Sequence, residues 1–341
     1  MKRWIKRIFF TGFWGSLALV WIVVGLFYYQ ASQPASEKNQ AMIFEIHPGM
    51  TLKQVALELS RQGLIRSPSA FQAIAYIQDK QKQIMVGEFS LSPSMPPSKI
   101  LLQITSGKTI LHPVTIPEGY RITEIATLLH SEGLADQEVF IRQTRDENLI
   151  RSLGISADNL EGYLFPETYH FSKFTPEKKI IQKMVDTFRE QVLKPQLLMS
   201  AKKSSLAWYE IITLASLIEK ETGLDSERKI ISSVFHNRLR KNMRLQTDPT
   251  VIYAMGKFDG NIRKRDLKID SPYNTYRYKG LPPGPIANPG LKSIVAAISP
   301  IESDHLFFVS RQDGSHHFSS TLIEHNRAVQ KYQLRKAHFR R

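Results

Sequence analysis

The ten residues Leu214-Ala-Ser-Leu-Ile-Glu-Lys-Glu-Thr-Gly223 place two glutamates at the end of a long apolar segment. From Ile211 to Ile218 this segment is apolar on every face of a 3.6-residue period, apart from Thr213 and Ser216, which predicts a helix buried on all sides. Gly223 is a residue type that commonly ends a helix. We therefore expect the larger domain of the chain to be built round this buried helix.

Glu219 falls in the last turn of the predicted helix, where desolvation and the negative end of the helix dipole both disfavour the ionised form. A glutamic acid that stays protonated near neutral pH is a candidate general acid. Glu221 lies roughly 200° further round the helix. The two carboxylates are thus expected to point apart, with only one of them buried. The alternative is that Glu219 is an ordinary terminal-turn glutamate paired with a lysine or arginine.

Composition narrows the classes of function. A chain of 341 residues can hold two modest domains. The absence of cysteine excludes disulfides, thiolate zinc sites and a cysteine nucleophile. The net charge of +15 favours an anionic partner or an anionic membrane surface. No Gly-x-Gly-x-x-Gly, P-loop, His-Glu-x-x-His or Gly-x-Ser-x-Gly motif is present, and the adjacent His316-His317 is more typical of structure than of a metal site. We expect no metal and no cofactor.

The N-terminus has the pattern of a membrane anchor. Basic residues within positions 1–7 precede the uncharged segment Ile8 to Tyr29, which is long enough to cross a bilayer as a helix. Residues 30–41 form a polar linker. The positive charge in front predicts a cytoplasmic N-terminus, a single pass through the inner membrane and a periplasmic body, which argues against nucleic acid as a partner. A cleaved signal peptide is the alternative, but the apolar segment is too long and no clean cleavage site follows it.

Two stretches seventy residues apart resemble each other, namely Phe44-Glu-Ile-His-Pro-Gly49 and Val114-Thr-Ile-Pro-Glu-Gly119. An alanine, a leucine and a second glycine follow at identical spacing in both. Each copy predicts a strand, a turn, an amphipathic helix from near Thr51 or Ile122, a glycine stop and a second helix. The second helices open near Ser69 and Asp136.

This small β-α-α pattern resembles LysM, a module that binds the amino-sugar backbone of cell-wall polymers. The two copies either bind sugar or serve only as scaffold. We predict an α+β fold in which residues 42–110 form a LysM-like subdomain and residues 111–341 form the second, mixed α+β domain.

Polar and aromatic segments offer the material of a sugar groove. Leu160 to Phe171 combines tyrosines with two acids, of which Glu167 is a candidate for a groove wall. From Asn242 to Pro289 the loops are dense in side-chain amides, hydroxyls and tyrosines, a composition that suits a polyhydroxylated ligand. Turn chemistry alone is the alternative for each loop.

Several of these segments together resemble the endolytic murein transglycosylases, the MltG or YceG-like family. The resemblance covers nearly the whole chain, including the single N-terminal anchor. Its motifs are Glu161-Gly-Tyr-Leu-Phe-Pro-Glu-Thr-Tyr169, Ala215-Ser-Leu-Ile-Glu-Lys-Glu-Thr222, Asn237-Arg-Leu239, Met243 to Tyr253, Tyr273-Asn-Thr-Tyr276, Gly280-Leu-Pro-Pro-Gly284 and His325-Asn326.

The resemblance implies a catalytic acid at Glu219 and cleavage between N-acetylmuramic acid and N-acetylglucosamine inside nascent glycan strands, without water. The muramoyl C6 hydroxyl closes on C1 to give a 1,6-anhydro end, which terminates elongation. The implied partners are peptidoglycan glycan strands, the membrane and membrane-bound polymerases of the penicillin-binding class. The implied substrate-binding residues are Gln246, Thr247, Asp248, Thr250, Tyr273, Asn274, Thr275 and Tyr276, with Glu167 beside them.

Two other classes of function stay open from the sequence. One is a catalytically silent wall-binding scaffold, in which the LysM-like part binds and Glu219 is structural. The other is an ordinary glycoside hydrolase with the same acid. It needs a second carboxylate that faces the site, for which Asp248 or Glu167 is the candidate.

Overall fold

The computed structural model describes residues 32–334 without interruption, and before them residues 14–15, 17–19, 21–22, 24–25 and 27–29. The predicted cytoplasmic segment 1–7 lies outside the described residues, and the predicted span of residues 8–29 lies only partly within them. Within these described ranges, no helix is both long enough and apolar enough to span a bilayer.

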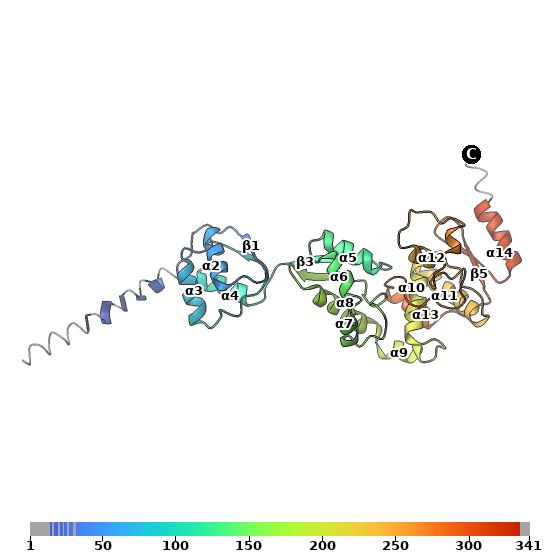
Figure 1. Ribbon diagram of the computed structural model, residues 1–341, viewed down its shortest axis with the longest axis horizontal. Helices are drawn as coiled ribbons and strands as arrows, with labels where there is room; N and C mark the ends of the chain where they lie inside the picture. Colours follow the sequence, from blue (N-terminus) through green and yellow to red (C-terminus); the bar gives the residue numbers. More distant parts are fainter. Residues whose placement is uncertain are drawn as a thin grey trace, which may run out of the picture. The chain divides into compact units, whose positions relative to one another are not determined.

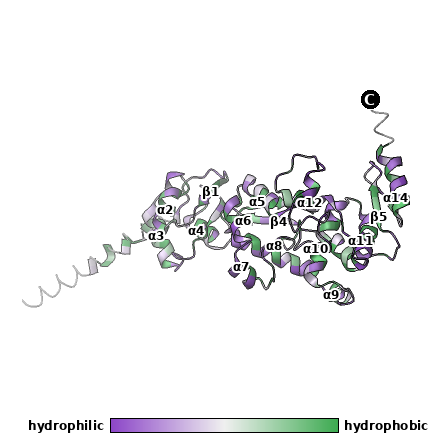
Figure 2. Ribbon diagram, turned by 45° about the vertical axis from the view of Figure 1, so that its right-hand side comes forward, coloured by the Kyte–Doolittle hydropathy of each residue, from purple (hydrophilic) through white to green (hydrophobic). Residues whose placement is uncertain are grey.

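The chain divides into two compact units (Figure 1). The first unit comprises Met1–His112 together with the short segment His170–Thr175. The second comprises Pro113–Tyr169 and Pro176–Arg341. Most helices of both units carry hydrophobic and hydrophilic residues side by side (Figure 2), as expected of helices with one buried face.

The first unit is built from two antiparallel strands and three helices. Strands β1 (Met42–Ile46) and β2 (Gly87–Leu91) pair with Phe44 opposite Phe89, and helices α2 (Leu52–Arg61), α3 (Pro68–Ile77) and α4 (Pro97–Thr105) complete the unit. The side chains of Phe44, Phe71 and Phe89 are fully buried in a core that belongs to this unit. The predicted order of strand, helix and helix is confirmed, whereas sugar binding by this unit stays a prediction.

The second copy of the repeat opens the second unit, with β3 (Leu111–Thr115), α5 (Ile122–Ser131) and α6 (Gln137–Gln143). Four glycines explain why the spacing recurs. Gly49 and Gly119 have φ of +84° and +76°, and Gly63 and Gly133 have φ of +74° and +68°. Only glycine adopts this left-handed region without steric cost, so each copy needs it at the turn before and after its first helix.

The second unit is mostly helical with small two-stranded sheets. Strand β3 pairs with β4, and β5 pairs antiparallel with β6. Strand β4 begins in this unit, and its residues from His170 on belong to the first unit. The remaining elements are α7 (Glu147–Ser152), β4 (Thr168–Ser172), α8 (Glu177–Val192), α9 (Pro195–Ala201), α10 (Trp208–Glu221), α11 (Asp225–Arg240), α12 (Asp248–Met255), the 3-10 helix η1 (Asp266–Lys268), α13 (Leu291–Ile298), β5 (Phe307–Ser310), β6 (His316–Ser319), α14 (Leu322–Val329) and the π-helix η2 (Gln330–Leu334).

Helix α10 is the predicted buried helix, and every residue from 211 to 218 is buried. It packs against α11 and α13. The two polar residues in the apolar run are satisfied inside the core: Ser216 Oγ donates to Thr213 O at 2.7 Å and accepts the Ile286 N–H at 3.0 Å, while Thr213 Oγ1 donates to Tyr209 O at 2.9 Å. The helix ends at Glu221, so both glutamates lie in its last turn.

Candidate active site

Glu219 is held by two donors. Its Oε1 lies 3.0 Å from Arg228 Nη2, and its Oε2 accepts the Gly290 N–H at 2.9 Å. Both the Arg228 and the Glu219 side chains are 5% exposed. Arg228 comes from α11 and is further held by Ser293 Oγ, to which its Nε donates at 3.0 Å. The arginine pairing that the sequence left open for Glu219 is therefore present.

The turn at residues 117–120 brings a second carboxylate beside Glu219. Glu118 Oε2 lies 3.6 Å from the same Arg228 Nη2, and Lys220 Nζ donates to Gly119 O at 3.2 Å. Burial, and then the charge of Glu219, raise the pKa of Glu118. Sequence reasoning missed Glu118 because its turn was interpreted only as the second copy of the repeat. An acid in the turn where the first copy has proline was the available signal.

Glu221 faces a cavity of about 510 Å³, which we call the Glu221 pocket. Desolvation raises the pKa of Glu221 to about 7, and the nearby charge of Asp248 acts in the same direction. A hydrogen bond from the Thr247 hydroxyl opposes this rise, as do the charges of His316 and Arg238. Both carboxyl groups are buried, so the prediction that only one of them is buried is wrong. They have different partners, Arg228 and Gly290 for Glu219 and Thr247 for Glu221, so the prediction that they point apart is not contradicted. Because Glu221 is the last residue of α10, the loop before α12 covers its carboxyl group.

Part of the predicted substrate-binding set lines the Glu221 pocket. Gln246, Asp248 and Tyr276 contribute to its wall. Tyr276 Oη donates to Asp248 Oδ1 at 2.6 Å, and the Gln246 N–H donates to Thr275 O at 3.2 Å. The segment before α12 and the loop that contains Tyr276 are thereby fixed to each other at the edge of the pocket.

Other members of the predicted set support that wall from behind. Thr250 and Asn274 are fully buried, and Thr275 is almost so. The Thr250 and Thr275 hydroxyls share a hydrogen bond at 2.9 Å, and Asn274 Nδ2 donates to Leu267 O and Ile269 O at 3.0 and 2.8 Å. These side chains hold the loops in place, which agrees with the alternative that the composition of these loops serves turn formation.

Two members of the predicted set lie away from the pocket wall. The Tyr273 ring packs on the ring of Tyr253, with centroids 4.8 Å apart. Glu167 is exposed, and its Oε1 accepts the N–H of Thr168 at the start of β4. Neither residue lines the Glu221 pocket.

Helix α11 and the C-terminal elements complete the pocket with residues that had no assigned role. Arg238, His316, His325 and Asn326 all line it. Arg238 Nη1 donates to Leu245 O at 2.7 Å, and the His325 ring stacks on Phe307 with centroids 5.1 Å apart. Burial is the main cause that lowers the pKa of His325. Among the residues that the structure describes, no cluster of three or more histidines and acids could hold a metal ion.

Asn288 joins two other segments of the second unit. Its Oδ1 accepts the N–H groups of Gly162 and Leu164, both at 2.9 Å, and its Nδ2 donates to Tyr120 O and Glu161 Oε1, also at 2.9 Å. The Asn288 side chain is fully buried. One amide therefore joins the turn that carries Glu118 to the segment that opens at Leu160.

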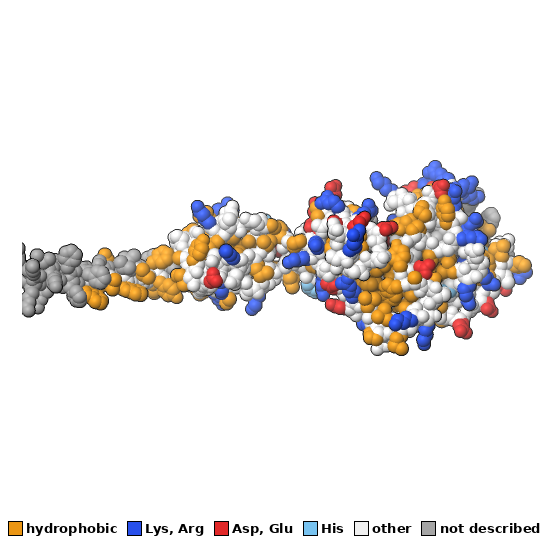
Figure 3. Space-filling model, turned by 60° about the horizontal axis from the view of Figure 1, so that its bottom comes forward, with side chains coloured by type: hydrophobic (Ala, Val, Ile, Leu, Met, Phe, Trp, Pro, Cys, Tyr) orange, Lys and Arg blue, Asp and Glu red, His pale blue; other side chains and the backbone are white. Residues whose placement is uncertain are grey.

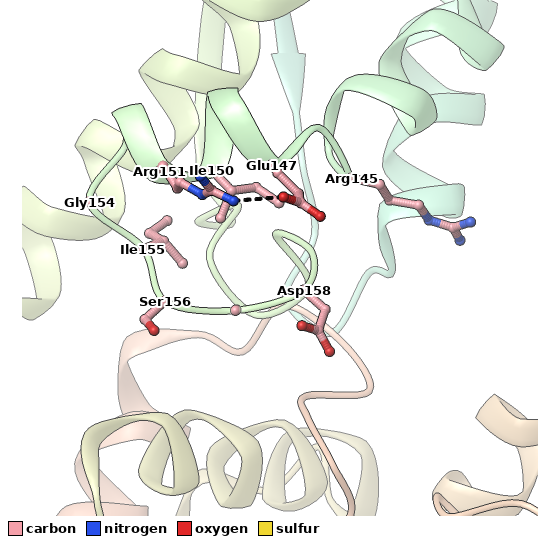
Figure 4. A pocket seen from close by; sticks show the side chains of 9 residues that line it. Arg145, Glu147, Ile150, Arg151, Gly154, Ile155, Ser156 and Asp158 are labelled. Carbon is pink, nitrogen blue, oxygen red and sulfur yellow. Dashed lines mark hydrogen bonds and ion pairs between the residues drawn. The ribbon is translucent and has the colours of Figure 1, made fainter.

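A second cavity, of about 770 Å³, lies between α7 and the loop at residues 154–158 (Figure 4). Arg151 Nη2 pairs with Glu147 Oε2 at 2.7 Å along one side, and Asp158 lies on the opposite side. Both partners of this pair are at least 75% exposed. None of the predicted site residues lines this cavity, so size alone does not identify the functional site.

Comparisons with known proteins agree on one family. The model of the YceG-like family matches residues 44–331. A protein of Bacillus subtilis (strain 168) named endolytic murein transglycosylase is 36% identical over 339 residues, which cover 91% of each chain. A protein of the same name from Streptococcus pneumoniae serotype 2 is 31% identical over 83% of this chain, and the match spans 57% of that longer protein.

A solved structure points the same way. The crystal structure of a YceG-like protein from Listeria monocytogenes is similar to this one, with a TM-score of 0.59 and 33% identity. The similarity covers 84% of this chain and 98% of that one. The chain therefore belongs to the YceG-like family and is a transglycosylase, as the names of the Bacillus subtilis and Streptococcus pneumoniae relatives indicate.

Proposed function

We propose that this protein is a peptidoglycan lytic transglycosylase whose catalytic acid is Glu221. The observation that carries the proposal is the Glu221 pocket, where a carboxyl group with a pKa of about 7 shares a cavity with Gln246, Asp248 and Tyr276. Its volume of about 510 Å³ lies in the range of ~300–1,000 Å³ that is usual for ligand sites. The relatives named endolytic murein transglycosylase support the choice of substrate.

The chemistry follows from the protonation of Glu221. An acid with a pKa near the working pH is protonated often enough to donate and is acidic enough to do so readily. Glu221 would donate its proton to the oxygen that links N-acetylmuramic acid to N-acetylglucosamine, and the C1–O bond would break. The muramoyl C6 oxygen would then close on C1 to give a 1,6-anhydro end, and its proton would pass to a base.

Glu219 is the weaker candidate for the acid, although the sequence favoured it. Both of its oxygens accept from donors that belong to the fold, Arg228 Nη2 and the Gly290 N–H. A proton donor must present a free O–H to the substrate. We assign Glu219 to positioning, since its two bonds join the last turn of α10 to α11 and to the start of α13.

The two glutamates can be separated by matched substitutions. Glu221→Gln keeps the shape of the side chain but removes the carboxylic proton, and we expect it to lower the cleavage rate by roughly a hundredfold or more. Glu219→Gln is the matched control on the same helix turn and should cost less. Rates are measured on purified glycan strands, and product ends are identified by mass spectrometry in water labelled with heavy oxygen.

The same experiment decides between classes of function. Mainly 1,6-anhydromuramoyl ends without labelled oxygen support the proposal. Reducing ends that carry labelled oxygen would make the enzyme a hydrolase, for which Asp248 is the second carboxylate that lines the pocket. A wild-type chain that binds wall without shortening strands would be a scaffold. If Glu219→Gln is the more damaging substitution, the assignment of the acid to Glu221 is wrong.

We also propose that the protein is a single-pass protein of the inner membrane with a periplasmic body, which cuts nascent strands near the polymerases that make them. The uncharged segment of residues 8–29 behind basic residues supports this placement. The intact protein should sediment with the inner membrane, and protease should reach its body only from the periplasmic side. Recovery of a soluble form that begins near residue 32 would contradict the anchor.

A further inference from the structure

A buried glutamate fixes the orientation of His316 next to the Glu221 pocket. Glu227, from α11, accepts twice from His316, which opens β6: Oε1 takes the backbone N–H at 2.8 Å, and Oε2 lies 2.6 Å from ring Nδ1. The two side chains are 12% and 11% exposed. The ring is also packed edge-on against Phe308, with centroids 5.5 Å apart. His316 is therefore held by both its backbone and its ring.

This arrangement decides which ring nitrogen is available for chemistry. Because Nδ1 is bound to a carboxylate, which only accepts, Nδ1 carries the hydrogen. Nε2 of the neutral ring then has a free lone pair. His316 and Glu221 line the same pocket, close enough that a proton on His316 would lower the pKa of Glu221. A carboxylate that orients a histidine in this way is the usual arrangement of a general base.

Resting on the proposed function, we propose that His316, oriented by Glu227, is a second catalytic acid–base residue of the pocket and takes the proton of the muramoyl C6 hydroxyl. In that step the C6 O–H bond breaks, its proton goes to His316 Nε2, and the C6 oxygen forms its bond to C1. At the same time the C1 bond to the leaving oxygen breaks, and that oxygen receives the proton of Glu221. Transfer of a proton from His316 back to the Glu221 carboxylate restores the site, so no proton is consumed overall.

Two separate groups have an advantage over a single carboxyl group. Glu221 cannot be a good base while it still holds the proton that it is donating. A neighbouring imidazole lets both proton transfers occur in one transition state. The other titratable groups that line the pocket are Glu221 from α10, Arg238 from α11, Asp248 from α12, Tyr276 from the following loop and His325 from α14.

The test compares the full-length wild type with His316→Gln, Glu227→Gln and His317→Gln across pH. His317→Gln is the matched control, because its ring lies against Tyr332, with centroids 5.6 Å apart, and does not line the pocket. We expect His316→Gln to lower kcat by about a hundredfold, with KM little changed, and to abolish the fall in rate on the acidic side of the pH profile. His317→Gln should leave both the rate and the profile unchanged.

Glu227→Gln tests the orientation of the ring. A glutamine can still accept the His316 backbone N–H, but its amide N–H would donate to Nδ1 and move the ring hydrogen to Nε2. We expect a loss of more than tenfold in kcat for this variant although its size is unchanged. In His316→Ala, added imidazole should restore part of the rate, which a merely structural histidine would not allow.

A failure of the role of His316 can be told apart from a failure of the proposed function. If His316→Gln keeps kcat within threefold and the acidic limb of the profile stays, the role of His316 is overturned. A profile that shifts as expected while the wild type yields labelled reducing ends would instead overturn the transglycosylase reaction and leave His316 as a base for water.

Discussion

Glu161 is a buried acid outside the Glu221 pocket, and its carboxyl group is costly to ionise. It is 5% exposed, and desolvation raises its pKa to about 8. This rise occurs although the Ile122 N–H and Asn288 Nδ2 both donate to the carboxyl group and Arg121 lies near. The native state therefore binds a proton on Glu161 at pH values where the unfolded chain has lost it.

The sign of the pH dependence follows from that difference. A carboxyl group with a raised native pKa stabilises the fold at low pH, and this contribution is lost as pH rises from about 4.5 towards 8. We expect Glu161→Gln to be more stable than the wild type at pH 8 to 9, by on the order of 1–4 kcal/mol, and to show little difference near pH 5. Urea unfolding measured across this pH range gives the two curves.

Glu167→Gln is the control for this prediction, because Glu167 belongs to the same segment but is exposed. Its stability curve should follow that of the wild type. A Glu161→Gln variant that loses stability at pH 9 would show that the donors around the carboxyl group outweigh its desolvation.

At the residue scale, the sequence located the acidic helix end, but it favoured Glu219 over Glu221 from helix position and a family resemblance alone. The place of Glu219 in the last turn predicted a buried side chain. This is correct, since the Glu219 side chain is 5% exposed. The partners of each acid come from segments far along the chain: Arg228 and Gly290 for Glu219, Thr247 and His316 for Glu221. A local periodicity contains no information about these partners.

At the scale of elements, helix α10 was predictable because its signal is local. All eight residues from 211 to 218 are buried, as the apolar run predicted. The Ser216 hydroxyl donates to a backbone carbonyl one turn earlier in the helix and accepts the N–H of Ile286. The capping box at Thr321 and Glu324, which begins α14, is a local signal of the same kind. The place of the loop at residues 117–120 beside Glu219 was not predictable, since it depends on tertiary hydrogen bonds.

The Asn288 side chain makes tertiary hydrogen bonds to two other segments of the second unit, so we expect the stability of this unit to depend on it. Asn288→Ala would leave the N–H groups of Gly162 and Leu164 buried without an acceptor and remove two donated bonds. We expect a loss of about 2–4 kcal/mol in the free energy of unfolding, since each unsatisfied buried group costs about 1–3 kcal/mol. Chemical denaturation of the two proteins measures this loss.

Asn261→Ala is the matched substitution at an exposed loop position, where only the backbone N–H makes a hydrogen bond. It should change stability by less than about 0.5 kcal/mol. Equal stability of Asn288→Ala and wild type would mean that the segments around Asn288 hold one another without it.

At the scale of the whole molecule, the two units differ in what the sequence revealed. The internal repeat predicted β1, α2 and α3 of the first unit, including their turns, but not β2 and α4. It did not reveal that the segment His170–Thr175 belongs to this unit. Lys173 in that segment pairs with Glu45 at 2.9 Å and with Glu88 at 3.1 Å. Charge complementarity between segments this far apart has no signature in a single sequence.

The surface charge suits an anionic polymer. Lysine and arginine side chains are spread over the visible face of both units (Figure 3), in keeping with the net charge of +15. Peptidoglycan strands carry carboxyl groups on their peptides, so this charge favours encounter with the wall at low ionic strength. Charge of this kind acts on association and does not specify where the strand is cut.

The first unit has its own core, so its contribution to wall binding can be tested by removing it. Deleting residues 42–110 removes β1, α2, α3, β2 and α4 and leaves the Glu221 pocket residues in place. If the LysM-like unit binds glycan, it raises the effective concentration of strand near the pocket. We expect the deletion to weaken binding to purified wall by about tenfold or more while the rate on short soluble strands stays within about twofold.

Binding is measured by sedimentation with insoluble wall, and both proteins carry Glu221→Gln so that cleavage does not remove the ligand during the assay. The reason for using short soluble strands in the rate measurement is that a strand too short to reach both units gains nothing from a second binding site. A truncated protein that binds wall as well as the intact one would show that the first unit is scaffold. Equal losses of binding and of rate on short strands would show instead that the second unit depends on the first for its folding.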